Sequence, residues 1–182
     1  CASSTHKGEE EFCIEIHKRL KKLHKNIVTI IIPRHVNRKD EIIQIIKEKN
    51  LNFYCHSSNK IIPVNTDIYL VDTYGESKSF YKISTVVFLG GSLVSKGGQN
   101  PLEAIRFGCI VVHGKHTFNF NEVYSMLDKE NLSFNANNFK QLNKVIFNLL
   151  IKKYDNKKKV IKFKKIGKNI LLKNVQTIKS LI

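Results

Sequence analysis

The sequence lacks a long apolar run and is poor in acidic residues. Its longest nearly unbroken apolar stretch, residues 27–33, has the length of a strand, whereas a membrane-spanning helix needs about 18 apolar residues. Asp and Glu number 15 against 31 Lys and Arg, so the formal net charge is +16. The 182 residues, 42% of them hydrophobic, suffice for one ordinary domain with a buried core.

The usual metal and redox motifs are also missing. The four cysteines form no CxxC pair, and the seven histidines show no HExxH spacing. We therefore expect no structural metal, and we expect reduced, partly buried thiols in a cytosol-like compartment. The cysteines are Cys1, Cys13, Cys55 and Cys109.

Two common nucleotide-binding motifs do not occur either. The sequence contains neither GxxxxGK[ST] nor GxGxxG, so a P-loop and the simple dinucleotide fingerprint are excluded. The chain begins CASSTHKGEE, without an initiating methionine. We expect it to be a piece of a longer protein.

Positive charge is concentrated near the C-terminal end. Residues 151–182 hold eleven lysines and one acid, Asp155. Such a tail suits nucleic acid, anionic lipid or an acidic substrate, but a general bias toward lysine also explains it. We expect a domain of residues 1–153 and a Lys-rich helix or tail of residues 154–182. That helix, interrupted at Gly167, is expected to cover part of the core with Val160, Ile161, Phe163, Ile170, Leu171 and Leu172.

Strand-like and helix-like segments alternate along the chain. Strands are predicted at 27–33, 52–56, 68–71, 85–90, 109–113 and 132–135. Helices are predicted at 8–25, with an N-cap among residues 3–5, and at 39–49, 76–83, from about 101, 120–129 and 138–153. Short β-branched strands alternating with helices predict an α/β fold, a Rossmann-like parallel sheet with helices on both faces.

In such sheets ligands bind beyond the carboxyl ends of the strands, so the residues after each strand are candidates. Arg34 follows the first predicted strand and either forks onto a phosphate or carboxylate or is a solvated loop residue. Gly75 allows a tight turn or a close approach of ligand, and Asp72 or Thr73 is a candidate N-cap of the next helix. His116 and Asn119 either line the same crevice or make local hydrogen bonds.

The stretch GGSLVSKGGQNPLEAIRFG, residues 90–108, is rich in glycine just ahead of a helix start. Asn100 is a good N-cap, and Pro101 suits the first helical position. Free N–H groups at such a helix start form an anion site. Glu103 either closes a capping box onto Asn100 or accepts hydrogen bonds from ribose hydroxyls while the helix end holds a phosphate. Only the second interpretation also explains the glycines.

Five ordered stretches together resemble the C-terminal half of the bacterial 3-deoxy-D-manno-octulosonic acid (Kdo) transferases. They are SSTHKGEEE (3–11), PRHVNR (33–38), DTYGES (72–77), GGSLVSKGGQNPLEAI (90–105) and GKHTFNF (114–120). The resemblance covers residues 1 to about 150 and implies the C-terminal domain of a GT-B glycosyltransferase. Its members transfer Kdo from CMP-Kdo to a lipid A precursor in lipopolysaccharide biosynthesis.

The resemblance also implies a set of donor-binding residues and leaves the catalytic residues elsewhere. By motif, CMP-Kdo would be held by Pro33, Arg34, Gly75, Glu76, Ser77, Asn100, Pro101, Leu102 and Glu103. Further candidates are His35, Gly91, Ser92 and His116. The general base and the site of the lipid A precursor acceptor are expected in a missing N-terminal half, so this half alone is expected to be inactive.

Three further expectations come from the resemblance. The implied reaction inverts the anomeric centre and uses no metal and no cofactor. The implied location is the cytoplasmic face of the bacterial inner membrane, where lysines would lie near anionic headgroups. One departure from the family pattern is Gln99, which stands where a His is usual and is expected to alter donor affinity or rate.

The alternative function is a basic domain that binds nucleic acid or an anionic surface through its Lys-rich tail. Such binding would weaken steeply with salt and would not need Asn100 or Glu103. Nucleic acid is the weaker partner, because the tail offers only Tyr154 and Phe163 for stacking on bases.

Overall fold

The structure is a computed structural model that describes residues 1–151 and 156–180. Its centre is one sheet of seven parallel strands in the order β3-β4-β2-β1-β5-β6-β7. The strands are β1 (Ala2–Thr5), β2 (Thr29–Pro33), β3 (Phe53–Cys55), β4 (Ile68–Leu70), β5 (Val86–Leu89), β6 (Ile110–His113) and β7 (Ser133–Asn135). The predicted Rossmann-like parallel sheet is therefore confirmed.

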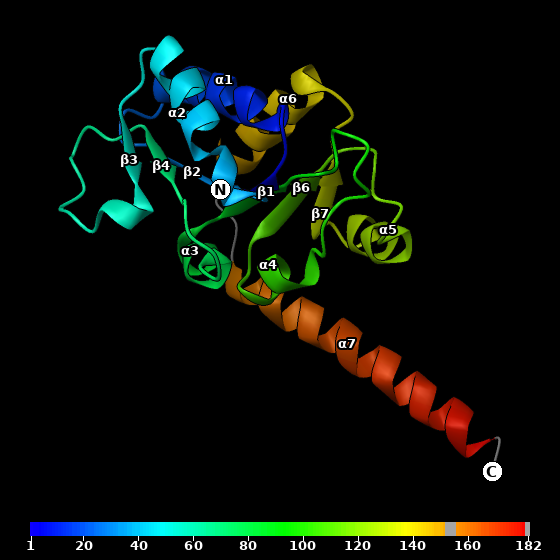
Figure 1. The fold of residues 1–182 in the computed structure, drawn as a ribbon. Coiled ribbons are helices and arrows are strands. Elements are labelled where there is room, and N and C mark those ends of the chain that lie inside the picture. Colours follow the sequence, from blue (N-terminus) through cyan, green and yellow to red (C-terminus); the bar gives the residue numbers. More distant parts are fainter. Residues whose placement is uncertain (152–155, 181–182) are drawn as a thin grey trace.

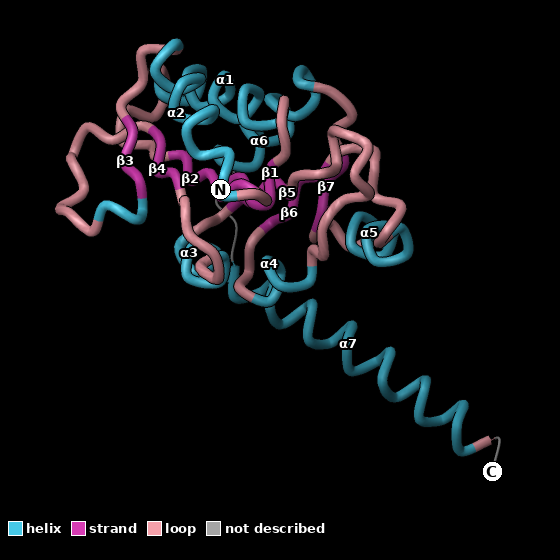
Figure 2. The backbone as a smooth tube through the Cα atoms, viewed as in Figure 1, coloured by secondary structure: helices cyan, strands magenta, loops and turns pink. Residues whose placement is uncertain are grey.

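Helices cover both faces of the sheet (Figures 1 and 2). On one face lie α1 (Glu9–Lys21), α2 (Lys39–Glu48) and α6 (Phe139–Ile151). On the other lie α3 (Ser77–Ile83), α4 (Leu102–Arg106) and α5 (Asn121–Lys129). Two short 3-10 turns, η1 (Val36–Arg38) and η2 (His56–Ser58), follow β2 and β3.

Alternation along the strands explains the two layers. In β5, Val86 and Phe88 pack with α1 and α6, whereas Val87 and Leu89 pack with α3, α4 and α5. All four side chains are buried. A strand whose two faces are both covered by helices needs apolar residues at every position, and that requirement produces the continuous run VVFL.

The central strand β1 was not predicted. Residues 3–5 were expected to cap the first helix, and that expectation is wrong, because they belong to a strand paired with both β2 and β5. Ser3 is fully buried, and its hydroxyl lies 2.7 Å from the Tyr81 hydroxyl. Helix α1 instead starts after Gly8, which has a φ of +93° that few other residues adopt.

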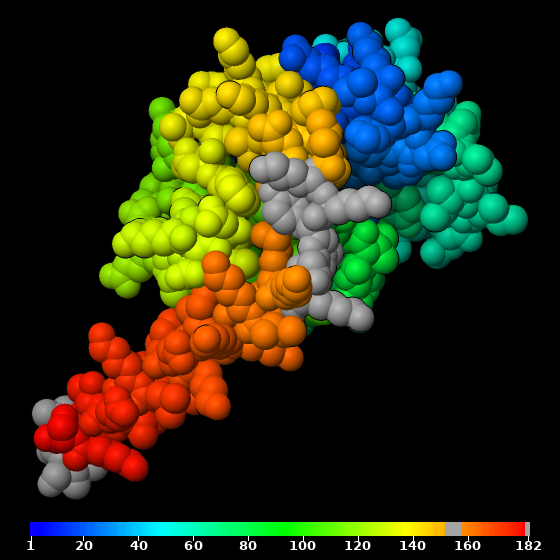
Figure 3. All heavy atoms as spheres, turned by 180° about the vertical axis from the view of Figure 1, so that it is seen from behind, coloured from blue at the N-terminus to red at the C-terminus, as the bar shows by residue number. Residues whose placement is uncertain are grey.

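The last helix, α7 (Asn156–Lys179), extends away from the body of the molecule (Figures 1 and 3). Its first turns dock: Phe163 and Ile166 pack against the core under α4, and the Lys162 ammonium lies 2.9 Å from the Glu130 carboxylate. The expectation of an interruption at Gly167 is wrong, since the helix continues through it. The expected covering role is also wrong for four side chains, which are exposed: Ile161, Ile170, Leu171 and Leu172.

The chain order around β1 creates a switch point in the sheet. Strands β2, β4 and β3 lie on one side of β1, and β5, β6 and β7 lie on the other. Connections on the two sides leave in opposite directions, so a crevice opens beyond the carboxyl ends of the central strands. The predicted site residues belong to the loops that follow these strands.

Candidate donor-binding site

The loops after β2 and β1 meet at the switch point. The Arg34 amide donates to the Thr5 carbonyl at 2.9 Å, which extends the strand pairing by one residue. Pro33 is buried at the end of β2, while Arg34 and His35 are exposed. The His35 ring meets the His6 ring edge-on, with centroids 5.8 Å apart. The Arg34 side chain is thus available to a ligand at the centre of this edge.

A buried carboxylate organises the neighbouring loops. Glu9, the first residue of α1, is fully buried and accepts four backbone hydrogen bonds. One oxygen accepts from the amides of His6 at 2.9 Å and Gly91 at 2.7 Å. The other accepts from the amides of Ser92 at 3.2 Å and Leu93 at 3.0 Å. The backbone nest that follows β5 is therefore filled by the protein's own anion.

This arrangement revises the interpretation of the glycine-rich loop. A Cβ on Gly90 would lie 2.4 Å from the Ser4 carbonyl oxygen and 2.7 Å from the Glu9 carboxylate. One on Gly97 would lie 2.3 Å from the Asn119 amide nitrogen. For Gly90 and Gly97 the prediction of bare backbone for a ligand is wrong, because internal packing already excludes a side chain.

Two of the further candidates also have structural roles. Ser92 has no exposed surface, and its hydroxyl donates to the Leu89 carbonyl at 2.5 Å and accepts from the Gly114 amide at 2.8 Å. The Ser92 hydroxyl therefore has a structural role, and its contact with a ligand stays a prediction. Gly91 is buried with a φ of +68°, and its amide donates to the Glu9 carboxylate.

Helix α4 begins at Leu102, immediately after the buried Pro101. The Asn100 side-chain oxygen accepts from the Leu102 amide at 3.0 Å, so Asn100 does cap this turn. The helix has only five residues, so its dipole is small. The predicted anion site at its start needs a larger dipole. Glu103 makes no bond back to Asn100 among the described residues. Its carboxylate is 42% exposed and lies 3.6 Å from the Lys78 ammonium.

The segment after β4 reaches the same crevice. Gly75 has a φ of +88° and lets the chain turn into Glu76 and Ser77, the start of α3. The pair formed by Lys78 and Glu103 connects α3 to α4 across the crevice. Arg34, Gly75 to Ser77 and Asn100 to Glu103 therefore follow β2, β4 and β5, three of the four strands around the switch point.

Asp72, a predicted N-cap, points elsewhere. Its carboxylate accepts from the Ser57 amide at 2.8 Å and the Ser57 hydroxyl at 2.6 Å, and it pairs with Lys39 at 2.5 Å. Burial raises the pKa of this carboxyl, but the Lys39 and Ser57 bonds outweigh it and lower the pKa to about 2. The prediction of a helix cap is wrong, and Asp72 instead joins η2 to α2.

The loop after β6 lies against the glycine-rich loop. The His116 amide donates to the Ser92 carbonyl at 2.9 Å, and the Asn119 side chain donates to the Lys96 carbonyl at 3.4 Å. Of the two alternatives for Asn119, the structure shows the local hydrogen bond. His116 is half-buried at the edge of the crevice, and its contact with a ligand stays a prediction.

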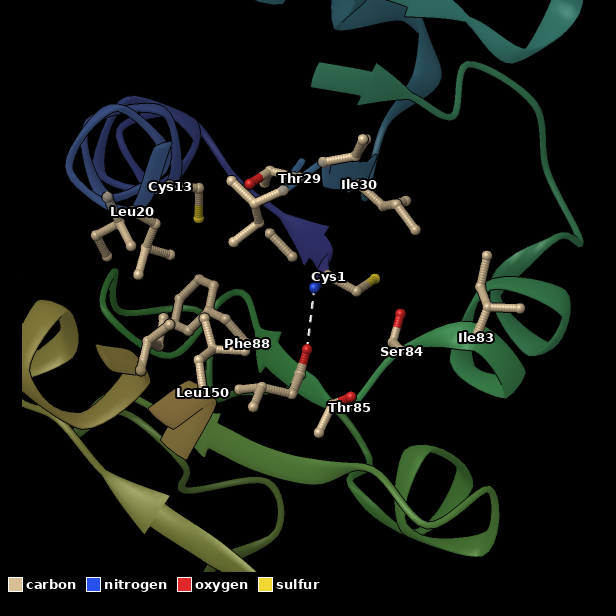
Figure 4. Close-up of a pocket in the computed structure, with 16 residues that line it drawn as sticks. Cys1, Cys13, Leu20, Thr29, Ile30, Ile83, Ser84, Thr85, Phe88 and Leu150 are labelled. Carbon is tan, nitrogen blue, oxygen red and sulfur yellow. Dashed lines mark hydrogen bonds between the residues drawn. The ribbon is translucent and has the colours of Figure 1, made fainter. Parts of the chain in front are cut away.

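A partly enclosed cavity in the described part of the chain lies away from this edge. It has a volume of about 180 Å³ and lies at the amino ends of the central strands (Figure 4). Its lining is apolar or uncharged apart from the amino group of Cys1, which donates to the Val86 carbonyl at 2.9 Å. It offers no charged side chain for a phosphate, so it is not the donor site. The labelled lining residues are Cys1, Cys13, Leu20, Thr29, Ile30, Ile83, Ser84, Thr85, Phe88 and Leu150.

Two negative observations apply to residues 1–151 and 156–180. No group of three or more His, Cys, Asp and Glu side chains is arranged to hold a metal ion there. No helix in these ranges has the length and apolarity to cross a membrane.

Comparison with known proteins identifies the family. No family model matches the chain. A crystal structure of the C-terminal CMP-Kdo binding domain of WaaA from Acinetobacter baumannii matches with a TM-score of 0.83 at 30% identity, over 91% of this chain and 86% of that one. This chain belongs to the Kdo transferase family, as its C-terminal domain. The family resemblance in the sequence is thereby confirmed.

Sequence comparison with Kdo transferases assigns the chain to the same family. The 3-deoxy-D-manno-octulosonic acid transferase of Haemophilus influenzae is 40% identical over 126 residues, and that of Aquifex aeolicus is 30% identical over 141. These matches cover 69% and 78% of the chain but only 30% and 38% of the relatives. The chain thus spans well under half the length of these Kdo transferases.

The structure adds residues that the sequence reasoning missed. His6, Glu9, Lys78 and Lys96 lie in or beside the crevice, and none was predicted as a site residue. The available signal was HKGEE directly after residues 2–5, but residues 3–5 were assigned to a cap and not to a strand. Without a strand before it, His6 had no position at the edge of the sheet.

Proposed function

We propose that this chain binds CMP-Kdo as the donor-binding domain of an enzyme that transfers Kdo to a lipid A precursor. The supporting observation is the match over most of both chains to a domain named for CMP-Kdo binding. The motif residues of the resemblance also gather at one edge of the sheet. This edge is where ligands bind in open parallel sheets.

Each group of residues has chemistry suited to one part of the donor. The exposed guanidinium of Arg34 can take the phosphate with two hydrogen bonds. The half-exposed carboxylate of Glu103 can accept from ribose hydroxyls, because no capping bond engages it. Gly75 to Ser77, at the start of α3, can approach the nucleotide closely. His35 stands beside Arg34 and is a further contact.

The remaining parts of the reaction belong to the rest of a longer protein. In this proposal the general base and the acceptor site lie in the N-terminal half, and the transfer inverts the anomeric centre. Arg34 would stabilise the leaving CMP phosphate electrostatically. The proposed place of action is the cytoplasmic face of the inner membrane, with this half peripheral to it.

Calorimetric or NMR titration of the chain with CMP tests the proposal. We expect saturable binding of CMP and CMP-Kdo by the wild type. Glu103→Gln should weaken CMP binding by about 1–3 kcal/mol, because the NH₂ group that replaces one carboxylate oxygen cannot accept from a ribose hydroxyl. Glu122→Gln, an exposed change on α5, is the matched control and should bind as the wild type does. A well-folded chain that shows no saturable CMP binding would refute the proposal.

One observation favours the second candidate, a surface that binds anionic lipid or nucleic acid. The outer part of α7 combines lysines with exposed apolar side chains, among them Leu171, Val175 and Ile178. Such a helix can lie on an anionic membrane surface. Binding of the chain to phosphatidylserine vesicles that falls steeply with salt, and is lost without residues 156–182, would support it. The two functions are compatible, since they use different parts of the molecule.

A further inference from the structure

Beyond the motif residues, one ring at the switch point has an unmet hydrogen-bonding group. His6 follows β1 directly, and its Nε2 atom is buried without a hydrogen-bond partner among the described residues. A buried polar group in this state costs about 1–3 kcal/mol, so it needs an explanation. Neighbouring groups hold the ring in place on several sides. A chance orientation of the ring therefore does not explain the unpaired Nε2 atom.

The backbone holds His6 at the crevice. Its amide donates to Glu9, and its carbonyl accepts from the Glu9 amide at 2.9 Å. Gly91 lies close to the ring edge that carries Nε2: a Cβ there would be 3.3 Å from the His6 Nε2 and Cδ2 atoms and from the Lys96 Cβ. His35 closes another side with its edge-on ring. The imidazole is therefore fixed between the loops after β2 and β5.

The charges around this ring are mostly positive. Lys96, His35 and Arg38 all act on His6, and the buried Glu9 is the one acid among its strongest neighbours. Arg38 is neutralised by Glu10 at 2.8 Å and Glu41 at 3.0 Å, and Glu9 already accepts four amides. Lys96 and the exposed Arg34 are thus the cations that remain near the ring, with the buried Glu9 as the opposing acid.

We propose that His6 is a further donor-contacting residue, whose Nε2 binds an anionic group of the donor with Lys96 beside it. This proposal rests on the proposed function and adds a residue to it. The nest that could have held a phosphate is filled by Glu9, so the anionic groups of CMP-Kdo must be met by side chains. The candidate groups are the phosphate and the Kdo carboxylate, which share the chemistry that an imidazole N–H recognises. Lys96 would move from its position over Gly91 as the donor enters.

Titration with three ligands tests this assignment. Cytidine has neither anionic group, CMP has the phosphate, and CMP-Kdo has the phosphate and the carboxylate. His6→Phe keeps a ring against Gly91 and His35 but removes both nitrogens. We expect it to leave cytidine binding unchanged and to weaken binding of an anionic ligand by about 10- to 100-fold. If His6→Phe weakens CMP binding, His6 contacts the phosphate. If it weakens CMP-Kdo binding and leaves CMP binding unchanged, His6 contacts the Kdo carboxylate.

Two further variants separate contact from structure. His6→Gln, which returns an N–H donor, should recover part of the lost affinity. His24→Phe, an exposed change after α1 at the other end of the molecule, should bind all three ligands normally. Because Nε2 has no partner, His6→Phe should also melt no lower than the wild type.

The outcomes are distinguishable. If His6→Phe binds every ligand as the wild type does, or weakens all three equally, the assignment of His6 is overturned while the proposed function stands. If the wild type binds none of the ligands, the proposed function fails, and the role of His6 fails with it.

Discussion

Replacing Glu9 with glutamine tests whether an internal carboxylate holds the loops of the crevice. The carboxylate accepts four hydrogen bonds from buried or partly buried amides, two on each oxygen. Glutamine keeps one oxygen but turns an NH₂ group toward the other two amides, which then lose their acceptor. Each such loss costs about 1–3 kcal/mol, and the smaller cost of burying a neutral group offsets part of it. We expect a net destabilisation of roughly 3 kcal/mol, or about 6–12 °C in the midpoint of thermal unfolding.

Denaturant unfolding and amide hydrogen exchange measure the effect. Exchange should accelerate most at the amides of Gly91 to Leu93, because their acceptor is weakened, while strands far from Glu9 should change only through global stability. Glu15→Gln, on the same helix, is the control, because its pair with Lys49 is exposed and should contribute little to stability. If Glu9→Gln costs no more than this control, the carboxylate does not organise the loops and the reasoning fails.

Three other predictions concern the rest of the molecule. Burial raises the pKa of Asp72, but its bonds to Lys39 and Ser57 lower it to about 2. Its contribution of about 2 kcal/mol to stability should therefore be present above pH 4 and lost on acidification toward pH 2. An acid titration of Lys39→Met should show a smaller loss, because only the Ser57 bonds remain. Arg38→Met should lower the free energy of unfolding by about 3–5 kcal/mol at pH 7, because it leaves Glu10 buried and unpaired. The decrease should be smaller at pH 5, because burial raises the pKa of Glu10. Denaturant unfolding at both pH values checks this. Removal of residues 156–182 should preserve the fold and the CMP affinity, because the first turns of α7 are the part that docks on the domain. Circular dichroism measures the fold and titration measures the affinity. Loss of either would argue against a separable tail.

Most of the fold could be predicted because its strands have apolar sequences. Runs such as IVTIIIP and VVFLG are typical of strands covered on both faces, and the helices between them show a 3.6-residue apolar period. Strand β1 was missed because ASST is short, small and mostly polar. The Ser3 hydroxyl has its partner in Tyr81, a tertiary contact that no local pattern reveals. The most central strand of the sheet therefore had the weakest signal.

The outer part of α7 shows a different limit. Its apolar residues predicted contact with the core, but hydrophobicity does not tell which surface a side chain will cover. In the described chain Phe163 and Ile166 find that surface under α4, while Leu171, Val175 and Ile178 extend past it. Only the length and direction of the helix decide this, and neither follows from its composition.

The glycine-rich loop shows how a correct family assignment can coexist with a wrong physical reason. Bare backbone ahead of a helix suggested that amides grip a nucleotide's phosphate. In the structure Glu9 takes those amides, and the glycines allow the close packing that brings it there. Such a loop needs no bound anion to fold, so the crevice is organised before the donor arrives. Recognition of the donor's charge then depends on side chains such as Arg34 and His6, and the affinity for CMP should fall with salt more than amide recognition alone would require.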